Sequence, residues 1–232
     1  MVGISNYVRF NNLPNAANDA LAIANLLKKA GAQVILAQDC NILQLREKKK
    51  QFLSLLNEGD IAIFFFEGHG CQFRNQQLLI ARPFNRMEIT ELEVKPKLIA
   101  EYSIQIDLLL DDLREKKTHF NLILLDCCRS FHYVDICRGG DDPIKDGDQQ
   151  RFNLNVPKGT VIGHASAPGD KAYDGSKSDG TKGSGYTKDP KSKGHPSNNC
   201  ASRALQIFIQ NGPIHPTRPF VSWSADANLL LC

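Results

Sequence analysis

Two short stretches of the sequence place reactive side chains directly after apolar runs. FFFEGHG at 64–70 contains His69 and Gly70, and ILLDCCRS at 123–130 contains Cys127 and Cys128. An imidazole beside a thiol makes the thiol proton easier to remove, and the resulting thiolate is a strong nucleophile. The two stretches therefore predict a His/Cys catalytic dyad, provided that the fold brings their ends together.

The runs before these side chains are predicted to be strands of a parallel sheet. Residues 60–66 and 120–126 are almost continuously apolar, which is typical of strands that are buried on both faces. Reactive groups gather beyond the carboxyl ends of such strands, so His69 and Cys128 are expected at one edge of the sheet. His69 precedes Cys128 by 59 residues (128 − 69). In one family of cysteine proteases the histidine lies roughly 50 residues before the cysteine.

Amphipathic helices are predicted before, between and after these strands, at 15–30, 42–56, 103–116 and 201–210. Further strands are expected at 34–37 and 159–166, and QQLLIA at 76–81 is predicted to be a short strand or part of a hairpin. This alternation predicts an α/β fold, with a mostly parallel central sheet covered by helices on both faces.

The helix expected at 103–116 has specific predicted features. Ser103 is expected to be its amino-terminal cap, because serine hydroxyls accept hydrogen bonds from the first helical N–H groups. The residues expected to face inward are Ile104, Leu108, Leu109 and Leu113.

Composition and charge exclude several classes of protein. The net charge is +3 over 232 residues, with both signs mixed, so neither nucleic acid nor a membrane surface is an expected partner. No apolar run approaches the roughly 18 residues that span a bilayer, and no Sec-type signal is expected at the start. Seven cysteines without regular spacing predict reduced thiols and a cytoplasmic location.

At these motifs the sequence resembles the caspase-like clan of cysteine proteases, and within it the metacaspases and paracaspases. GISNY, LPNAANDALAIANLLKKAGAQV, EGHG, LLDCCRS and VIGHASAPGDKA occur in the family's order over residues 1–173. The resemblance implies a caspase-like three-layer sandwich whose sheet runs 2-1-3-4, with further strands from the C-terminal part. The chain departs from the family in having only Met1 and Val2 before GISNY, so either the first strand is very short or the sequence starts within it.

The resemblance also implies a division of the chain. Residues 1–136 would form a large-subunit-like catalytic region, 137–155 an intersubunit-type linker, and 156–232 a small-subunit-like region. The linker and the segment 174–199 are rich in Gly, Ser, Pro and charged residues and are expected to be mobile loops. Self-cleavage after Arg138 or Lys145 in the linker is a hypothesis.

Residue by residue, the resemblance implies that His69 is the general base and Cys128 the nucleophile. The glycines at 68 and 70 would let the backbone approach a substrate, and the Gly70 and Cys128 amides would then stabilise the oxyanion. Cys127 is expected to face the core.

The resemblance further implies an acidic S1 pocket that selects Arg or Lys at the P1 position. Its acids would be Asp19, Asp126 and Asp170, with Lys171 at the third position in an alternative alignment. Carboxylates hold a guanidinium through charge-assisted hydrogen bonds, which agrees with this preference.

Simpler interpretations stay open for most of these residues. A cysteine at a strand end is often only part of the core, and Asp19 is favoured by the helix dipole in any case. Asp126 would also fit a structural acid, and His164 a histidine of the core or rim. The acids of DDPIKDGD at 141–148 would fit either a solvated loop or a Ca²⁺ site.

The sequence therefore predicts a cytoplasmic cysteine endopeptidase that cleaves polypeptides after Arg or Lys and requires no cofactor, with Ca²⁺ and a homodimer left open. One alternative is a catalytically inactive caspase-like scaffold in signalling, which the short first strand favours. A second alternative is a small-ligand-binding doubly wound domain, but GISNYVRFNN has only Gly3 where that fold has a glycine-rich loop.

Overall fold

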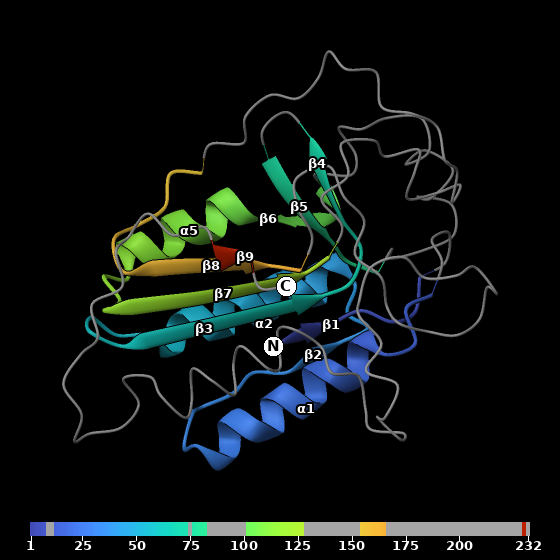
Figure 1. The fold of residues 1–232 in the computed structure, drawn as a ribbon, viewed down its shortest axis with the longest axis horizontal. Coiled ribbons are helices and arrows are strands. Elements are labelled where there is room, and N and C mark those ends of the chain that lie inside the picture. The colour runs from blue at the N-terminus through green and yellow to red at the C-terminus, as the bar shows by residue number, and fades with distance from the viewer. Residues whose placement is uncertain (8–11, 74–75, 83–100, 128–153, 166–228, 231–232) are drawn as a thin grey trace.

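A computed structural model describes residues 1–7, 12–73, 76–82, 101–127, 154–165 and 229–230 of the chain. Its centre is a six-stranded sheet with the order β2-β1-β3-β7-β8-β9, in which every neighbouring pair is parallel (Figure 1). The strands are β1 (Val2–Gly3), β2 (Ala37–Gln38), β3 (Ile61–Glu67), β7 (Phe120–Asp126), β8 (Thr160–His164) and β9 (Leu229–Leu230). The expected order of the first four parallel strands is confirmed.

A second, antiparallel sheet extends the fold beyond the carboxyl end of β3. It consists of β4 (Gly70–Phe73), β5 (Gln76–Ile80) and β6 (Ser103–Gln105), in that order. The predicted hairpin at QQLLIA is the β4–β5 pair, in which Gly70 lies opposite Leu79.

Helices cover both faces of the central sheet: α1 (Ala16–Lys29) lies on one face, and α2 (Ile42–Leu55) and α5 (Ile106–Glu115) lie on the other (Figure 1). The cause is the alternation of side chains along buried strands. Phe65 packs with Ile23 and Leu27 of α1, whereas Phe64 and Phe66 pack in the cluster that contains α2 and α5. Burial of each such phenylalanine side chain stabilises the folded protein by about 1.5–3 kcal/mol relative to leaving it exposed. The arrangement of helices on both faces of the sheet confirms the predicted sandwich.

Two predictions about element bounds are wrong because of pairing in the sheets, and the prediction that Leu108 faces inward is also wrong. The helix expected at 103–116 begins at Ile106, and Ser103 is a strand residue rather than a cap, because 103–105 pair with β5. Leu108 is 51% exposed, and the buried face of α5 carries Ile106 and Leu110 with Leu109 and Leu113. The strand expected at 34–37 is only Ala37–Gln38, since β1 offers just two residues for pairing.

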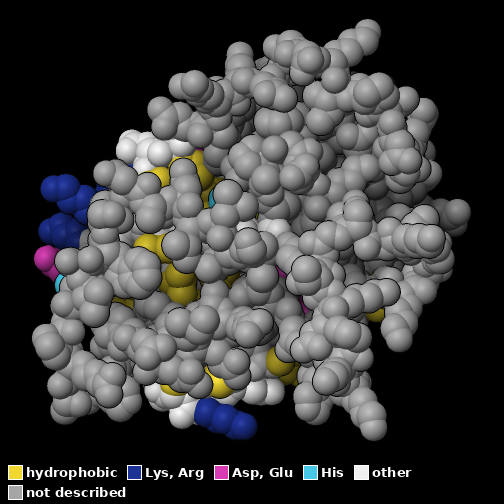
Figure 2. Space-filling model, viewed as in Figure 1, with side chains coloured by type: hydrophobic (Ala, Val, Ile, Leu, Met, Phe, Trp, Pro, Cys, Tyr) yellow, Lys and Arg dark blue, Asp and Glu magenta, His cyan; other side chains and the backbone are white. Residues whose placement is uncertain are grey.

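Helix apolarity and surface charge can be judged only for the described residues. In the part of the chain that the structure describes, no helix combines the length and apolarity needed to span a bilayer. On the face seen in Figure 2, the described lysine and arginine side chains stand in separate groups at the margin. The helix expected at 201–210, the loop at 174–199 and most of the linker at 137–155 lie outside the described residues.

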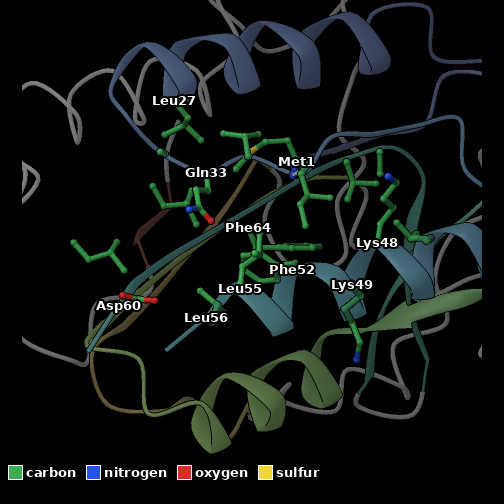
Figure 3. Close-up of a pocket in the computed structure, with 18 of the residues that line it drawn as sticks. Met1, Leu27, Gln33, Lys48, Lys49, Phe52, Leu55, Leu56, Asp60 and Phe64 are labelled. Atoms are coloured by element: carbon green, nitrogen blue, oxygen red, sulfur yellow. Dashed lines mark hydrogen bonds between the residues drawn. The ribbon is translucent and has the colours of Figure 1, made fainter. Parts of the chain in front are cut away.

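A cavity of about 400 Å³ lies at the end of the sheet where β3 begins. Its lining is mostly apolar and comes from Leu27, Phe52, Leu55 and Leu56 around the first half of β3 (Figure 3). His69 follows the other end of β3, so this cavity is separate from the residues predicted to carry the chemistry.

Close packing of α1 on the short strand β1 depends on Gly3. A Cβ atom at Gly3 would lie 2.3 Å from the Ala16 carbonyl oxygen and 2.7 Å from the Ala20 Cβ. Neither neighbour can move without shifting α1, which is the helix that carries Asp19.

We therefore expect Gly3→Ala to destabilise the protein by about 2–4 kcal/mol, as overpacked cores do. Urea unfolding followed by circular dichroism measures this change. Gly31→Asn is the control for loss of a glycine without overpacking, because a Cβ there meets nothing within 4 Å and only the backbone strain at its φ of +86° remains, which costs at most about 1–2 kcal/mol. Equal unfolding midpoints for Gly3→Ala and the native protein would contradict this account of the α1–β1 contact.

Candidate active site

The candidate active site begins where β3 and β7 end together. The two strands pair at all seven positions, from Ile61 with Phe120 to Glu67 with Asp126. The chain leaves β3 through Gly68, whose N–H donates to the Asp126 carbonyl oxygen at 3.3 Å. His69 and Cys127 therefore follow neighbouring strands at the same end of the sheet.

The backbone of His69 is held by two hydrogen bonds. Its N–H donates to the Tyr7 Oη at 2.9 Å, and its carbonyl oxygen accepts from the Ile80 N–H at 2.9 Å. The imidazole is half-buried, and its centroid lies 4.5 Å from that of the Tyr7 ring. The predicted general base thus occupies a fixed position at the junction of the two sheets.

Cys127 faces the core, as expected for the residue before the predicted nucleophile. It is 1% exposed and belongs to the cluster on the α5 face, and its Sγ accepts from Gln77 Nε2 at 3.7 Å. Cys128 lies outside the described residues. The dyad therefore stays a prediction.

The other described cysteines do not fit the role of nucleophile. Cys40 and Cys71 are buried thiols, and desolvation raises the pKa of the Cys40 thiol. A raised pKa lowers the thiolate fraction at neutral pH, which disfavours Cys40 as a nucleophile.

Two of the three predicted pocket acids are described, and they lie at the same end of the sheet. Asp19 is 8% exposed on the face of α1 that packs on the sheet, next to Ala20 over Gly3. Asp126 is half-buried at the end of β7. Because Leu122 and Leu124 pack with α1, alternation along β7 directs Asp126 to that same face.

Sequence reasoning overlooked a third acid at this end of the sheet, Glu67. It is 7% exposed, it pairs with Asp126 across β3 and β7, and it pairs with Gly3 on its other side. Paired residues of parallel strands point to the same face, so Glu67 and Asp126 lie side by side on the α1 face. The available signal was an acid at the end of a continuous apolar run, directly before GHG.

The first turn of α1 packs close to these carboxylates. It lies on Gly3, which is the neighbour of Glu67 in the sheet, and Asp126 is the neighbour of Glu67 on the other side. Helix amino termini favour nearby negative charge. Glu67 and Asp126 thus bring two carboxylates side by side at the end of the sheet on which α1 begins, and Asp19 is buried on α1 there.

The remaining predicted site residues are placed only in part. Gly70 begins β4, immediately after His69, and its role in an oxyanion hole stays a prediction. Asp170 and the alternative Lys171 lie outside the described residues, as do the acids at 141–148. His164 is buried in β8 beside Leu125, which agrees with a core histidine. Among the described residues, no group of three or more His, Cys, Asp or Glu side chains is arranged to hold a metal ion.

Comparison with known proteins agrees with this arrangement of strands. The family model described as "Caspase domain" matches residues 1–189. The chain belongs to the caspase-domain family. The resemblance expected from GHG, LLDCCRS and the motifs around them is thereby confirmed.

Two curated relatives of this caspase domain come from mammals. The human mucosa-associated lymphoid tissue lymphoma translocation protein 1 is 25% identical over 174 residues, which are 75% of this chain and 19% of the human protein. The mouse homolog is 24% identical over 174 residues, which are 75% of this chain and 18% of the mouse protein. The chain thus spans about a fifth of the length of these relatives.

Proposed function

We propose that this caspase domain is a cysteine endopeptidase with His69 as general base and Cys128 as nucleophile. The observation that supports it is the full β3–β7 register, which brings the residues after Glu67 and Asp126 to one edge of the sheet. Membership of the caspase-domain family agrees with this chemistry.

In the proposed reaction, His69 takes the Cys128 thiol proton and the Cys128 sulfur attacks the scissile carbonyl carbon. The Gly70 and Cys128 amides stabilise the negative oxygen of the tetrahedral intermediate. The protonated His69 gives its proton to the leaving amine, which leaves a thioester on Cys128. His69 then takes a proton from water, the hydroxide cleaves the thioester, and the thiol is restored.

We infer a preference for Arg or Lys at the P1 position of the substrate. Asp19 and Asp126 support this inference, because both carboxylates lie at the same end of the same face, and Glu67 adds a third beside Asp126. A guanidinium or ammonium group forms charge-assisted hydrogen bonds with such carboxylates. Asp170 completes this set in the proposal. The reaction needs no cofactor, and the substrates are polypeptides.

The direct test is cleavage of matched fluorogenic tetrapeptides that carry Arg, Lys, Leu or Asp at P1. We expect cleavage after Arg and Lys at least ~100-fold faster than after Leu or Asp, since each of at least two charge-assisted contacts contributes about 1.5–3 kcal/mol. Parallel assays with Ca²⁺ or a chelator test whether the acids at 141–148 matter. Cleavage confined to the Asp peptide would show that the pocket is misassigned.

A catalytically inactive caspase-like scaffold is the second candidate, and the two-residue length of β1, which lies between β2 and β3 in the sheet, favours it. An acyloxymethyl ketone probe with Arg at P1 separates the two candidates, because it reacts with an activated thiolate. The peptidase would be labelled on Cys128, and labelling would be lost in His69→Ala. An intact, folded protein that resists the probe would favour the scaffold.

Self-cleavage in the linker is a further expected consequence of an Arg/Lys preference. The linker contains Arg138 followed by Gly139 and Lys145 followed by Asp146. Intact-mass spectrometry after incubation should show fragments that end at Arg138 or Lys145. Cys128→Ala, purified and incubated in the same way, should give no such fragments. Fragments of equal abundance in that variant would identify a contaminating protease instead.

A further inference from the structure

Tyr7 connects the segment after β1 to the residues around His69. Its hydroxyl accepts a hydrogen bond from the His69 N–H at 2.9 Å and donates one to the Ile80 carbonyl oxygen at 3.1 Å. The Ile80 N–H donates in turn to the His69 carbonyl oxygen at 2.9 Å. These three hydrogen bonds form a closed cycle, in which both backbone polar groups of His69 are occupied.

The ring of Tyr7 also contacts the imidazole. The two ring centroids are 4.5 Å apart with an interplanar angle of 57°, which is a tilted aromatic pair. Tyr7 is 6% exposed, so its ring is itself fixed by the core and cannot swing away from His69. One buried side chain therefore restrains both the backbone and the side chain of the predicted base.

Two other residues, Asn12 and Gly68, allow Tyr7 to occupy this position. Its own N–H donates to Asn12 Oδ1 at 2.8 Å, which fixes its backbone. A Cβ atom at residue 68 would lie 2.7 Å from the Tyr7 Oη, so only glycine leaves room for the hydroxyl beside His69. The glycine before His69 thus has a structural reason that is independent of substrate approach.

We propose that Tyr7 is a positioning residue for His69, which holds the imidazole in the orientation needed to take the Cys128 proton. This inference rests on the proposed peptidase function. Proton transfer requires the base within hydrogen-bond reach of the thiol, so small displacements of the imidazole reduce the rate strongly. Tyr7 touches neither substrate nor the reacting atoms, and it acts through His69.

The test compares Tyr7→Phe and Tyr7→Leu with the native protein. Phenylalanine keeps the ring and removes the hydroxyl, and we expect it to lower kcat about 10-fold with KM changed less than about 2-fold. Leucine also removes the ring contact, and we expect a loss of about 100-fold. Thr118→Val is the control, because it removes a partly buried hydrogen bond to Asn121 at the opposite end of β7 and should leave kcat unchanged.

A second measurement separates this inference from the proposed function. Amide hydrogen exchange by NMR needs no activity, and the His69 amide should exchange at least ~10-fold faster in Tyr7→Phe than in the native protein. The Phe65 amide in the centre of β3 should not change. If the native protein were inactive but showed this exchange difference, the proposed peptidase function would be refuted, and the restraint of His69 by Tyr7 would still hold. An active protein whose Tyr7→Phe variant keeps its kcat within 2-fold would overturn the positioning role, as would an unchanged His69 exchange rate.

Discussion

Cys128→Ala is expected to lower the rate of peptide cleavage at least ~1,000-fold, and His69→Ala is expected to do nearly the same. Both side chains act in one proton transfer, so removing either removes the shared step. The double variant should therefore be no slower than the slower single variant. Fluorogenic cleavage of the Arg peptide at saturating substrate measures all three rates.

Stability measurements give the control for this prediction. His69 is half-buried and follows the end of β3, so His69→Ala should keep a cooperative unfolding transition. Cys127→Ala is the matched cysteine variant. It removes a buried core thiol and should lower stability more than activity. Loss of activity in Cys127→Ala with full activity in Cys128→Ala would reverse the assignment of the nucleophile.

Asp126→Asn is expected to lower kcat/KM for the Arg peptide about 10–100-fold while changing the Leu peptide less than about 3-fold. Asparagine keeps the size of the side chain and removes the charge, so the loss equals one charge-assisted hydrogen bond of about 1.5–3 kcal/mol. Since Glu67 lies beside Asp126 in the sheet, Glu67→Gln should shift the preference in the same direction.

Asp112→Asn provides the matched control for these pocket variants. Asp112 lies on α5, on the other face of the sheet, where it pairs with Lys49 at 2.5 Å. Removing a partly exposed ion pair costs at most about 1 kcal/mol, so the ratio of Arg to Leu cleavage should not change. If Asp126→Asn lowered cleavage of the Arg and the Leu peptide by the same factor, Asp126 would act through general stability rather than through the pocket.

The sequence was informative where the determinants are local or strongly periodic. The apolar runs before Glu67 and Asp126 predicted β3 and β7 correctly, because strands buried on both faces need continuous apolar residues. The repeat of small and aliphatic residues along 16–27 predicted the buried face of α1 for the same kind of reason. Together these elements placed His69 at the correct edge of the sheet.

Non-local contacts account for what the sequence did not reveal. Ile104 has the spacing of a helix residue, but it pairs with Leu79 and so extends a strand. Tyr7 and His69 are 62 residues apart, and no periodicity marks their hydrogen bond. Glu67 was overlooked because its partner in the sheet is set by strand order, which local patterns do not encode.

The most direct test of the proposed dyad is the pH dependence of Cys128 alkylation by iodoacetamide, read by peptide mass spectrometry in the native protein and in His69→Ala. If the two side chains share a proton, native Cys128 should react rapidly below pH 7, and His69→Ala should react only as pH approaches the ordinary thiol pKa of about 8.5. Cys40 is the internal control, since it is buried and should stay slow in both proteins. Identical pH profiles for Cys128 in the two proteins would contradict a shared proton between His69 and Cys128.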